Sequence, residues 1–182
     1  MQRIGTAAAM ALVIATLLGC GSGAQVAAES GASSAAVVTM PKISRPERTY
    51  TVDDLRLAGW KPVRQYDISG LPHATEAWRG FFSQMEFEAR FYAGHSDAIA
   101  YGMEWADVVT GPDARVFGPE VRWEEGARDR RQYNAPTGTH GSGSYTPRYG
   151  DFVIAGNMVL LCEGSDSVAA LLNCERFLAN VK

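Results

Sequence analysis

The chain has few of the residues from which common active sites are built. Its 182 residues include three histidines and three cysteines, and the histidines form no HxH or HxxxH pair. The sequence also lacks CxxC, GxSxG and a glycine-rich loop between a strand and a helix. These absences give no support for a zinc site, a nucleophile elbow or a phosphate loop, so neither a metal nor a cofactor is expected.

Basic residues are not in excess either. The formal net charge is −3, and no basic stripe of the kind that marks a nucleic-acid-binding protein runs along the chain. Mild acidity of this degree is typical of a soluble domain. No nucleic-acid partner is therefore expected.

The N-terminal segment is the most informative part of the sequence. Residues 4–18 carry no charge, Arg3 precedes them, and Gly19 stands directly before Cys20. A basic start, an apolar stretch and a small residue at its end are typical of a secretory signal peptide. The uncharged stretch is shorter than the roughly 20 residues of a membrane-spanning helix, so an uncleaved anchor ranks last among the interpretations.

The Leu-Leu-Gly-Cys sequence at positions 17–20 resembles the lipobox of bacterial lipoproteins. In that family the cysteine is lipidated and becomes the first residue of the mature protein. The resemblance implies an extracytoplasmic domain that is held to a bacterial membrane through lipid on Cys20, since several acyl chains give stable attachment. An ordinary signal peptide cleaved after Ala24 or Ala28 is the alternative.

The rest of the chain divides into a tether and one domain. Residues 21–48 are rich in Ala, Ser and Gly and show no apolar periodicity, which is typical of a flexible linker. The predicted organisation is a signal peptide at 1–19, the lipidated cysteine and tether at 20–48, and a single domain at 49–182.

Cys162 and Cys174 are an even pair in a domain that is expected to be exported, where disulfides form and persist. Cys162 ends a strand-like run, and Cys174 lies on one face of a predicted helix. A bridge between them is predicted, worth about 3 kcal/mol in the chain-entropy model. Two buried free thiols are the alternative.

Apolar periodicity predicts a mixed α+β domain. Residues 85–93 alternate strictly, which predicts a strand with one buried face and one wet face that carries Glu86, Glu88, Arg90 and Tyr92. Further patterns predict helices at 52–58, 73–82, 97–109 and 165–181, and strands at 63–68, 151–155 and 158–162. We expect a two-layer sandwich, ferredoxin-like or related, with helices packed on one face of a small, mainly antiparallel sheet.

A long irregular insert is expected at about 111–150. Its first part is heavily charged with both signs, and its second part is rich in Gly, Ser, Thr and Pro. A mobile loop with aromatic and basic residues is typical of a ligand lid. A solvated charged turn followed by a floppy insertion is the interpretation that the interleaved charges favour.

The candidate ligand contacts come from this insert and from the wet strand face. Paired carboxylates two residues apart suit acid–base chemistry or calcium, but they are also what an exposed strand face carries, so no catalytic residue is assigned. The candidate contacts are Glu86, Glu88, Arg90, Arg130, His140 and Arg148.

Residues 91–93, 97–98, 102 and 156–164 resemble an uncharacterised family of predicted bacterial lipoproteins. That family has no assigned activity, and the resemblance implies that residues 123–131 belong to the shared domain. The sequence therefore favours a membrane-tethered module that binds a solute, an envelope polymer or a protein. An envelope hydrolase and an assembly subunit of a larger envelope complex are the alternatives.

Overall fold

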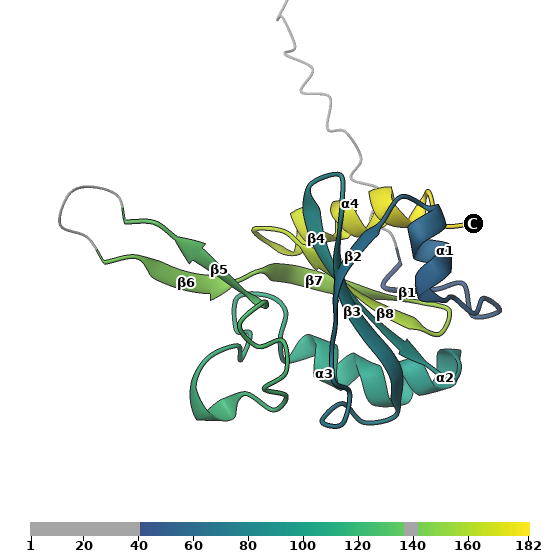
Figure 1. Cartoon of the computed structure of the whole chain (residues 1–182), viewed down its shortest axis with the longest axis horizontal. Helices are drawn as coiled ribbons and strands as arrows, with labels where there is room; N and C mark the ends of the chain where they lie inside the picture. The colour runs from purple at the N-terminus through teal and green to yellow at the C-terminus, as the bar shows by residue number, and fades with distance from the viewer. Residues whose placement is uncertain (1–40, 137–141) are drawn as a thin grey trace, which may run out of the picture. The chain divides into compact units, whose positions relative to one another are not determined.

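The computed structural model describes residues 41–136 and 142–182, and most of their regular structure is β (Figure 1). A six-stranded mixed sheet has the strand order β1-β7-β8-β4-β3-β2. Here β1 is parallel to β7, and the other neighbouring strands are antiparallel. The strands of the sheet are β1 (Ile43–Ser44), β2 (Lys61–Gln65), β3 (Ala74–Phe82), β4 (Met85–Tyr92), β7 (Tyr149–Ala155) and β8 (Met158–Glu163).

A second, two-stranded sheet forms a ribbon that extends away from the first (Figure 1). It consists of β5 (Arg131–Asn134) and β6 (Ser144–Pro147), paired antiparallel with Tyr133 opposite Tyr145. The ribbon leads directly into β7 of the main sheet. Part of the predicted irregular insert is therefore regular structure.

The helices are short apart from the last one. They are α1 (Val52–Leu57), α2 (His95–Asp97), the π-helical turn η1 (Ala98–Gly102), α3 (Met103–Asp107), the 3₁₀ turn η2 (Gly118–Glu120) and α4 (Ser167–Leu178). The cap of α1 is a capping box, in which Thr51 and Asp54 each accept the other's backbone N–H. Local sequence therefore fixes the start of this helix.

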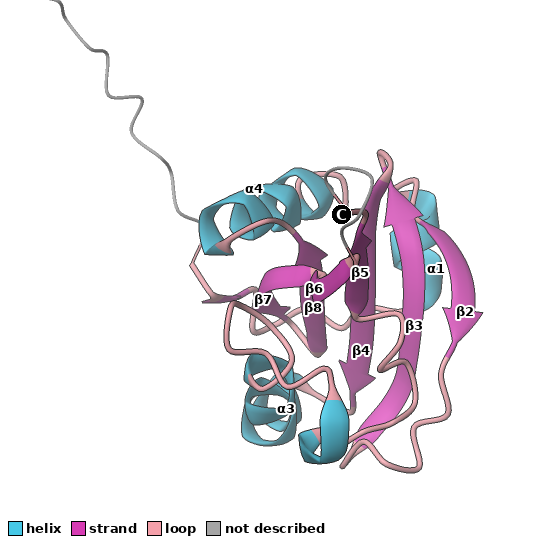
Figure 2. Ribbon diagram, turned by 90° about the vertical axis from the view of Figure 1, so that its left-hand side faces the viewer, coloured by secondary structure: helices cyan, strands magenta, loops and turns pink. Residues whose placement is uncertain are grey.

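The strands β4, β7 and β8 of the main sheet are buried on both faces, and Figure 2 shows α4 above and α3 below β7 and β8. On one face Phe87 of β4 packs against Phe177 of α4, with ring centroids 5.0 Å apart. On the other face Tyr92 and Val159 pack in one cluster with Ala106 of α3. The sheet is therefore a middle layer between two sets of apolar contacts.

The predicted two-layer α+β sandwich is wrong, because the domain is mostly β and its sheet is covered on both sides. The expectation rested on an alternating strand with one wet face, and that face is inside the protein. Charged side chains can line a buried sheet face when they are paired with opposite charges. Alternation of polarity alone therefore does not show which face of a strand is exposed to solvent.

The helix predicted at 73–82 is also wrong, since these residues form β3. Their apolar spacing fits a helix, but the strand pairs with both β2 and β4, and this tertiary pairing overrides the local pattern. Gly80 allows the backbone to approach Trp60: a Cβ there would lie 2.5 Å from Cε2 of the indole. A strand at this position needs glycine because of that close approach.

Other predicted elements are confirmed. Residues 85–93 form β4, the strands at 151–155 and 158–162 form the β7–β8 hairpin, and the C-terminal helix is α4. A disulfide joins Cys162 of β8 to Cys174 of α4, with 5.7 Å between the Cα atoms, and both residues are fully buried. In the part of the chain that the structure describes, no helix has the length and hydrophobicity to cross a membrane.

Candidate functional site

The face of β4 that was expected to be wet is inside the protein, and residues 121–130 cover the part that carries Glu88 and Arg90. Glu86, Glu88, Arg90 and Tyr92 are each 1 % exposed or less, so the expectation that they form an open contact surface is wrong. Arg130, another candidate contact, is 1 % exposed and comes from the covering loop. The charged part of the insert is therefore a lid that is bonded to the sheet.

Glu88 is the centre of this buried charge network. Its carboxylate accepts hydrogen bonds from Nε of Arg90 at 2.7 Å and from Nε and Nη2 of Arg130 at 2.8 and 3.0 Å. Burial alone would raise the pKa of Glu88, but the guanidinium groups of Arg130 and Arg90 outweigh that effect and hold the pKa below its ordinary range. The carboxylate is therefore held ionised between two cations.

Trp123 fills the space beside the two guanidinium groups. The Arg130 guanidinium carbon lies 4.3 Å and that of Arg90 lies 5.3 Å from its ring centroid, which are cation–π distances. Gly126 in the same loop has φ +73°, and a Cβ there would lie 2.9 Å from the Tyr66 ring. The loop therefore needs glycine at this point to close over the arginines.

A second set of contacts surrounds Glu86. Its carboxylate accepts from Nη2 of Arg79 at 2.8 Å and from the hydroxyl of Tyr149 at 3.0 Å, and Arg148 lies 3.2 Å away. Burial raises the pKa of Tyr149 well above its ordinary value, and the nearby carboxylates of Glu88 and Glu86 raise it further. The phenol is therefore a neutral donor.

The charged groups of this network are paired mainly with other groups of the chain itself. Arg148 is part-buried and donates to the carbonyl oxygens of Asp129 and Arg131. Among the atoms of this network, Nη2 of Arg90 and Nε of Arg79 have no partner in the described residues. Acids and bases that already satisfy each other hold the lid in place, so this region stabilises the fold.

Each of the two described histidines, His73 and His95, contacts a different part of the chain. His140 lies outside the described residues. The Nδ1 atom of His95 is 2.7 Å from the carbonyl oxygen of Gly156, and the His73 ring stacks on Tyr101 with centroids 3.7 Å apart. Within residues 41–136 and 142–182, no group of three or more His, Cys, Asp or Glu side chains has an arrangement that could hold a metal ion.

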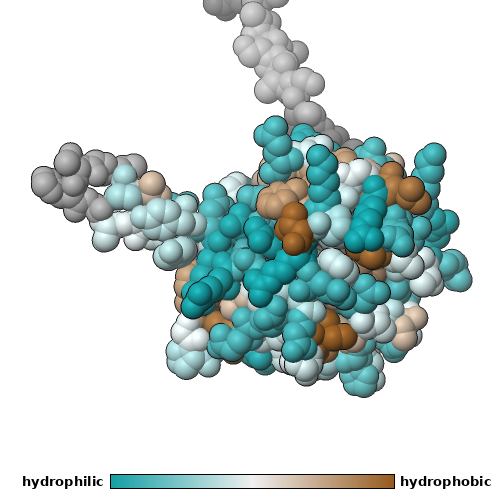
Figure 3. Space-filling model, in the orientation of Figure 1, coloured by the Kyte–Doolittle hydropathy of each residue, from teal (hydrophilic) through white to brown (hydrophobic). Residues whose placement is uncertain are grey.

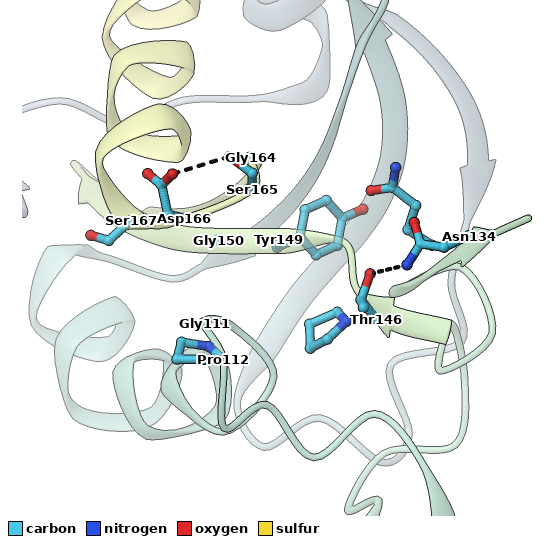
Figure 4. Close-up of a pocket in the computed structure, with 12 residues that line it drawn as sticks. Gly111, Pro112, Asn134, Thr146, Tyr149, Gly150, Gly164, Ser165, Asp166 and Ser167 are labelled. Carbon is cyan, nitrogen blue, oxygen red and sulfur yellow. Dashed lines mark hydrogen bonds between the residues drawn. The ribbon is translucent and has the colours of Figure 1, made fainter. Parts of the chain in front are cut away.

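A pocket of about 690 Å³ lies where the ribbon joins the main sheet (Figure 4). We call it the ribbon pocket. Its walls come from the ribbon, from the turn after α3, from the start of β7 and from the turn that begins α4. The lining residues are Gly111, Pro112, Gln132, Asn134, Thr146, Pro147, Tyr149, Gly150, Gly164, Ser165, Asp166 and Ser167.

Close backbone packing shapes the ribbon pocket. A Cβ on Gly150 would lie 2.3 Å from the carbonyl oxygen of Asp166, and a Cβ on Gly164 would lie 2.4 Å from the backbone nitrogen of Ala170. The N–H of Gly111 donates to the carbonyl of Tyr149 at 2.9 Å, which ties the turn after α3 to β7. The pocket floor therefore consists of closely packed peptide backbone.

The side chains that line the ribbon pocket are almost all uncharged. Asn134 donates to the hydroxyl of Thr146 at 3.0 Å, and Figure 4 shows the two side chains meeting on the ribbon. Asp166 is the ionisable carboxylate of the lining, and it accepts the N–H of Ala169 as the N-cap of α4. That hydrogen bond, with one from Ser165, lowers the pKa of Asp166. The helix N-terminus is thus already neutralised, and the pocket offers uncharged donors and acceptors.

The two faces of the ribbon differ in chemistry. Gln132 and Asn134 alternate with Tyr133 along β5, so amides lie on one face and the tyrosine on the other. Tyr133 and Tyr145 are 55 % and 58 % exposed, with ring centroids 5.2 Å apart, and Phe117 lies 6.3 Å from Tyr145. Figure 3 shows the ribbon reaching out beside a body whose visible surface is mainly hydrophilic.

The residues of the ribbon pocket were missed by reasoning from the sequence. Residues 134–150 were interpreted as an irregular segment because Gly, Ser, Thr and Pro dominate them. The signal that was available is the polar–aromatic alternation in 132–134, repeated in 144–146. Two such runs on either side of a glycine-containing stretch indicate a hairpin.

A family model matches residues 51–182 of the chain, and its description is a family of unknown function, DUF6810. The chain belongs to the DUF6810 family. No curated protein and no solved structure matches it significantly. The DUF6810 match spans both the lid over β4 and the ribbon pocket, so the 121–130 loop and the ribbon are within the family domain. The expectation of an uncharacterised family is thereby confirmed.

Proposed function

We propose that this DUF6810 chain is a lipid-anchored, extracytoplasmic binding module that takes a neutral saccharide unit of an envelope polymer in the ribbon pocket. The observation that carries the proposal is the lining of uncharged amides and hydroxyls over glycine backbone, with its carboxylate engaged as a helix cap. Sugar hydroxyls donate and accept at once, and amide side chains complement both roles.

The size of the pocket supports this ligand class. A volume of about 690 Å³ lies within the range of small-molecule sites, and the polar groups converge from four separate segments. Lysine, arginine and histidine are absent from the lining, so an anionic ligand would find no counter-charge there. The exposed tyrosines on the other face of the ribbon offer flat apolar surfaces for the C–H faces of further sugar rings.

The location follows from the N-terminal sequence. The apolar stretch before Gly19 and Cys20 favours export and lipidation, and the buried Cys162–Cys174 disulfide is compatible with an oxidising compartment. In this proposal the membrane is a partner through the lipid, and the chain between Cys20 and β1 is the spacer between the membrane and the domain.

Calorimetric titration with the neutral trimer of N-acetylglucosamine tests the ligand. Saturable binding is expected, and the double variant Gln132→Ala/Asn134→Ala is expected to weaken it about tenfold, since two hydrogen-bonding side chains are lost. Gln65→Ala is the matched control, because Gln65 is exposed on β2 at the far edge of the sheet. Absence of binding to this trimer and to other neutral saccharides would contradict the proposal.

Expression of the full chain in a bacterial host tests the anchor. Cys20→Ser is expected to abolish lipid labelling and to release the protein from the membrane fraction. The control is Cys162→Ser/Cys174→Ser, which leaves Cys20 in place. Unchanged processing and membrane association of Cys20→Ser would contradict the lipoprotein assignment.

A further inference from the structure

A second cavity lies at the opposite end of α4 from the ribbon pocket. Its volume is about 510 Å³, and its lining is shared by the β3–β4 hairpin and the C-terminal half of α4. Figures 1 and 2 both show the turn of this hairpin beside α4. We call it the hairpin groove. The lining residues are Phe82, Ser83, Met85, Phe87, Asn173, Arg176, Ala179 and Asn180, and none of them lines the ribbon pocket.

The floor of the hairpin groove is apolar. Phe82 and Phe87 both pack on Phe177 of α4, with ring centroids 4.9 and 5.0 Å apart. Phe82 and Met85 are paired across the hairpin and are only part-buried, so apolar surface of both remains accessible. The groove thus offers an aliphatic group a firm surface that is continuous with the hydrophobic core.

The tight turn at the end of the hairpin holds this surface in place. Ser83 and Gln84 have φ values of 48° and 69°, a conformation in which glycine or asparagine is usual. The two-residue turn sets Phe82 directly opposite Met85 and leaves Ser83 at the edge of the groove. A longer loop would let the two apolar side chains separate.

The polar rim of the groove favours an anion. Arg176 is exposed, and no carboxylate of the described residues lies within 4.0 Å of its guanidinium group, in contrast to the paired arginines of the charged network. The amide groups of Asn173 and Asn180 already donate to the carbonyl oxygens of Glu163 and Arg176. Arg176 is therefore the side chain that provides positive charge and strong donors at this rim.

We propose that the hairpin groove binds a single-chain aliphatic carboxylate as a monomer from solution. The alkyl chain lies against Phe82 and Met85, and the carboxylate pairs with Arg176, with the Ser83 hydroxyl as a further donor. An apolar groove with one guanidinium at its rim complements an amphiphilic anion at both ends, whereas the ribbon pocket has no basic side chain in its lining to pair with a carboxylate. This site is independent of the saccharide site.

Calorimetric or NMR titration of the purified protein with hexanoate, octanoate and decanoate, below their micelle concentrations, tests this proposal. Affinity is expected to rise with chain length, by up to about fourfold for each methylene that is fully buried. Arg176→Gln is expected to weaken decanoate binding about tenfold and to leave decanol binding unchanged. Ala179→Trp, at an exposed position on the groove, is expected to block both ligands.

Arg115→Gln is the matched control, because Arg115 is 54 % exposed and lines neither the hairpin groove nor the ribbon pocket. Equal affinity along the carboxylate series, or equal decanoate binding by wild type and Arg176→Gln, would overturn the proposal.

Vesicles of phosphatidylglycerol test the alternative that the hairpin groove binds an anionic membrane surface and not a free carboxylate. Binding to such vesicles without saturable binding of free decanoate would also overturn the proposal.

Discussion

The two polar regions of this domain use their side chains in opposite ways. Under the 121–130 loop, Glu88 is fully buried and bonded to Arg90 and Arg130, so charges of the chain satisfy one another. In the ribbon pocket, Gln132 and Asn134 belong to an exposed ribbon and face an open cavity. The buried charged residues therefore stabilise the structure, whereas the uncharged polar residues of the ribbon are available for a ligand.

The largest expected effect comes from breaking the charged region. Glu88→Gln leaves two buried guanidinium groups without their carboxylate, and we expect the free energy of unfolding to fall by about 3–5 kcal/mol. Urea denaturation followed by tryptophan fluorescence measures this, since Trp123 lies against both arginines.

Glu104→Gln is the control for this experiment. Glu104 pairs with Arg122 at the surface and is 68 % exposed, so its loss is expected to change stability by no more than about 1 kcal/mol. Similar stability losses in Glu88→Gln and Glu104→Gln would contradict the structural role of the buried network.

Features that depend on neighbouring residues could be predicted from the sequence, whereas features that depend on distant partners could not. The alternation in residues 85–93 and the cysteine pair are local signals, and they correctly predicted β4 and the disulfide. The burial of Glu88 depends on Arg130, 42 residues later, and no local pattern contains that partner. The charged loop and the strand were each interpreted as solvated because the charges that neutralise them are distant in sequence.

The candidate site was unpredictable for a related reason. The ribbon pocket combines Gly111, Gln132, Thr146 and Ser165, which meet because the ribbon returns to β7 beside the start of α4. Small and polar residues of this kind are the usual composition of loops, so nothing in composition alone separates a pocket lining from a linker. The hairpin alternation within 131–147 was the one local clue.

Removing the Cys162–Cys174 disulfide tests how much stability this bridge contributes beside the ribbon pocket. The bridge joins β8 to α4, whose first turn lines the ribbon pocket. Cys162→Ala/Cys174→Ala is expected to lower the free energy of unfolding by about 2–4 kcal/mol. Parallel denaturation of wild type with and without reductant is the check. A reduced wild type as stable as the oxidised form would show that the bridge contributes nothing.

High pH should act on the charged region through Tyr149. Its pKa is raised in the folded protein above the ordinary value of 10.0, so the folded state keeps a proton that the unfolded chain releases. The contribution of Tyr149 to the free energy of unfolding is full below pH 10 and falls by about 1.4 kcal/mol for each pH unit above pH 10. When the pH is raised from about 9 to about 11, the free energy of unfolding is expected to fall less in Tyr149→Phe than in wild type, as measured by urea denaturation. An equal loss in both proteins would be the contrary result.

The smallest effect on stability is expected at the aromatic face of the ribbon. Tyr145 is 58 % exposed, so Tyr145→Ser is expected to change stability by less than about 0.5 kcal/mol. If a saccharide chain extends over this face, the variant weakens binding of the trimer several-fold and leaves the monomer unaffected. Equal weakening of both ligands would indicate that Tyr145 acts on the pocket itself.

The most direct test of the contrast is a map of backbone amide shifts by NMR during titration with the N-acetylglucosamine trimer. We expect saturable shifts at Gln132, Asn134, Thr146 and the residues that begin α4, and no shifts of the amides of 121–130. Shifts centred on Trp123 and Arg130, with none around the ribbon pocket, would contradict this expectation, because the charged lid would then be the binding surface.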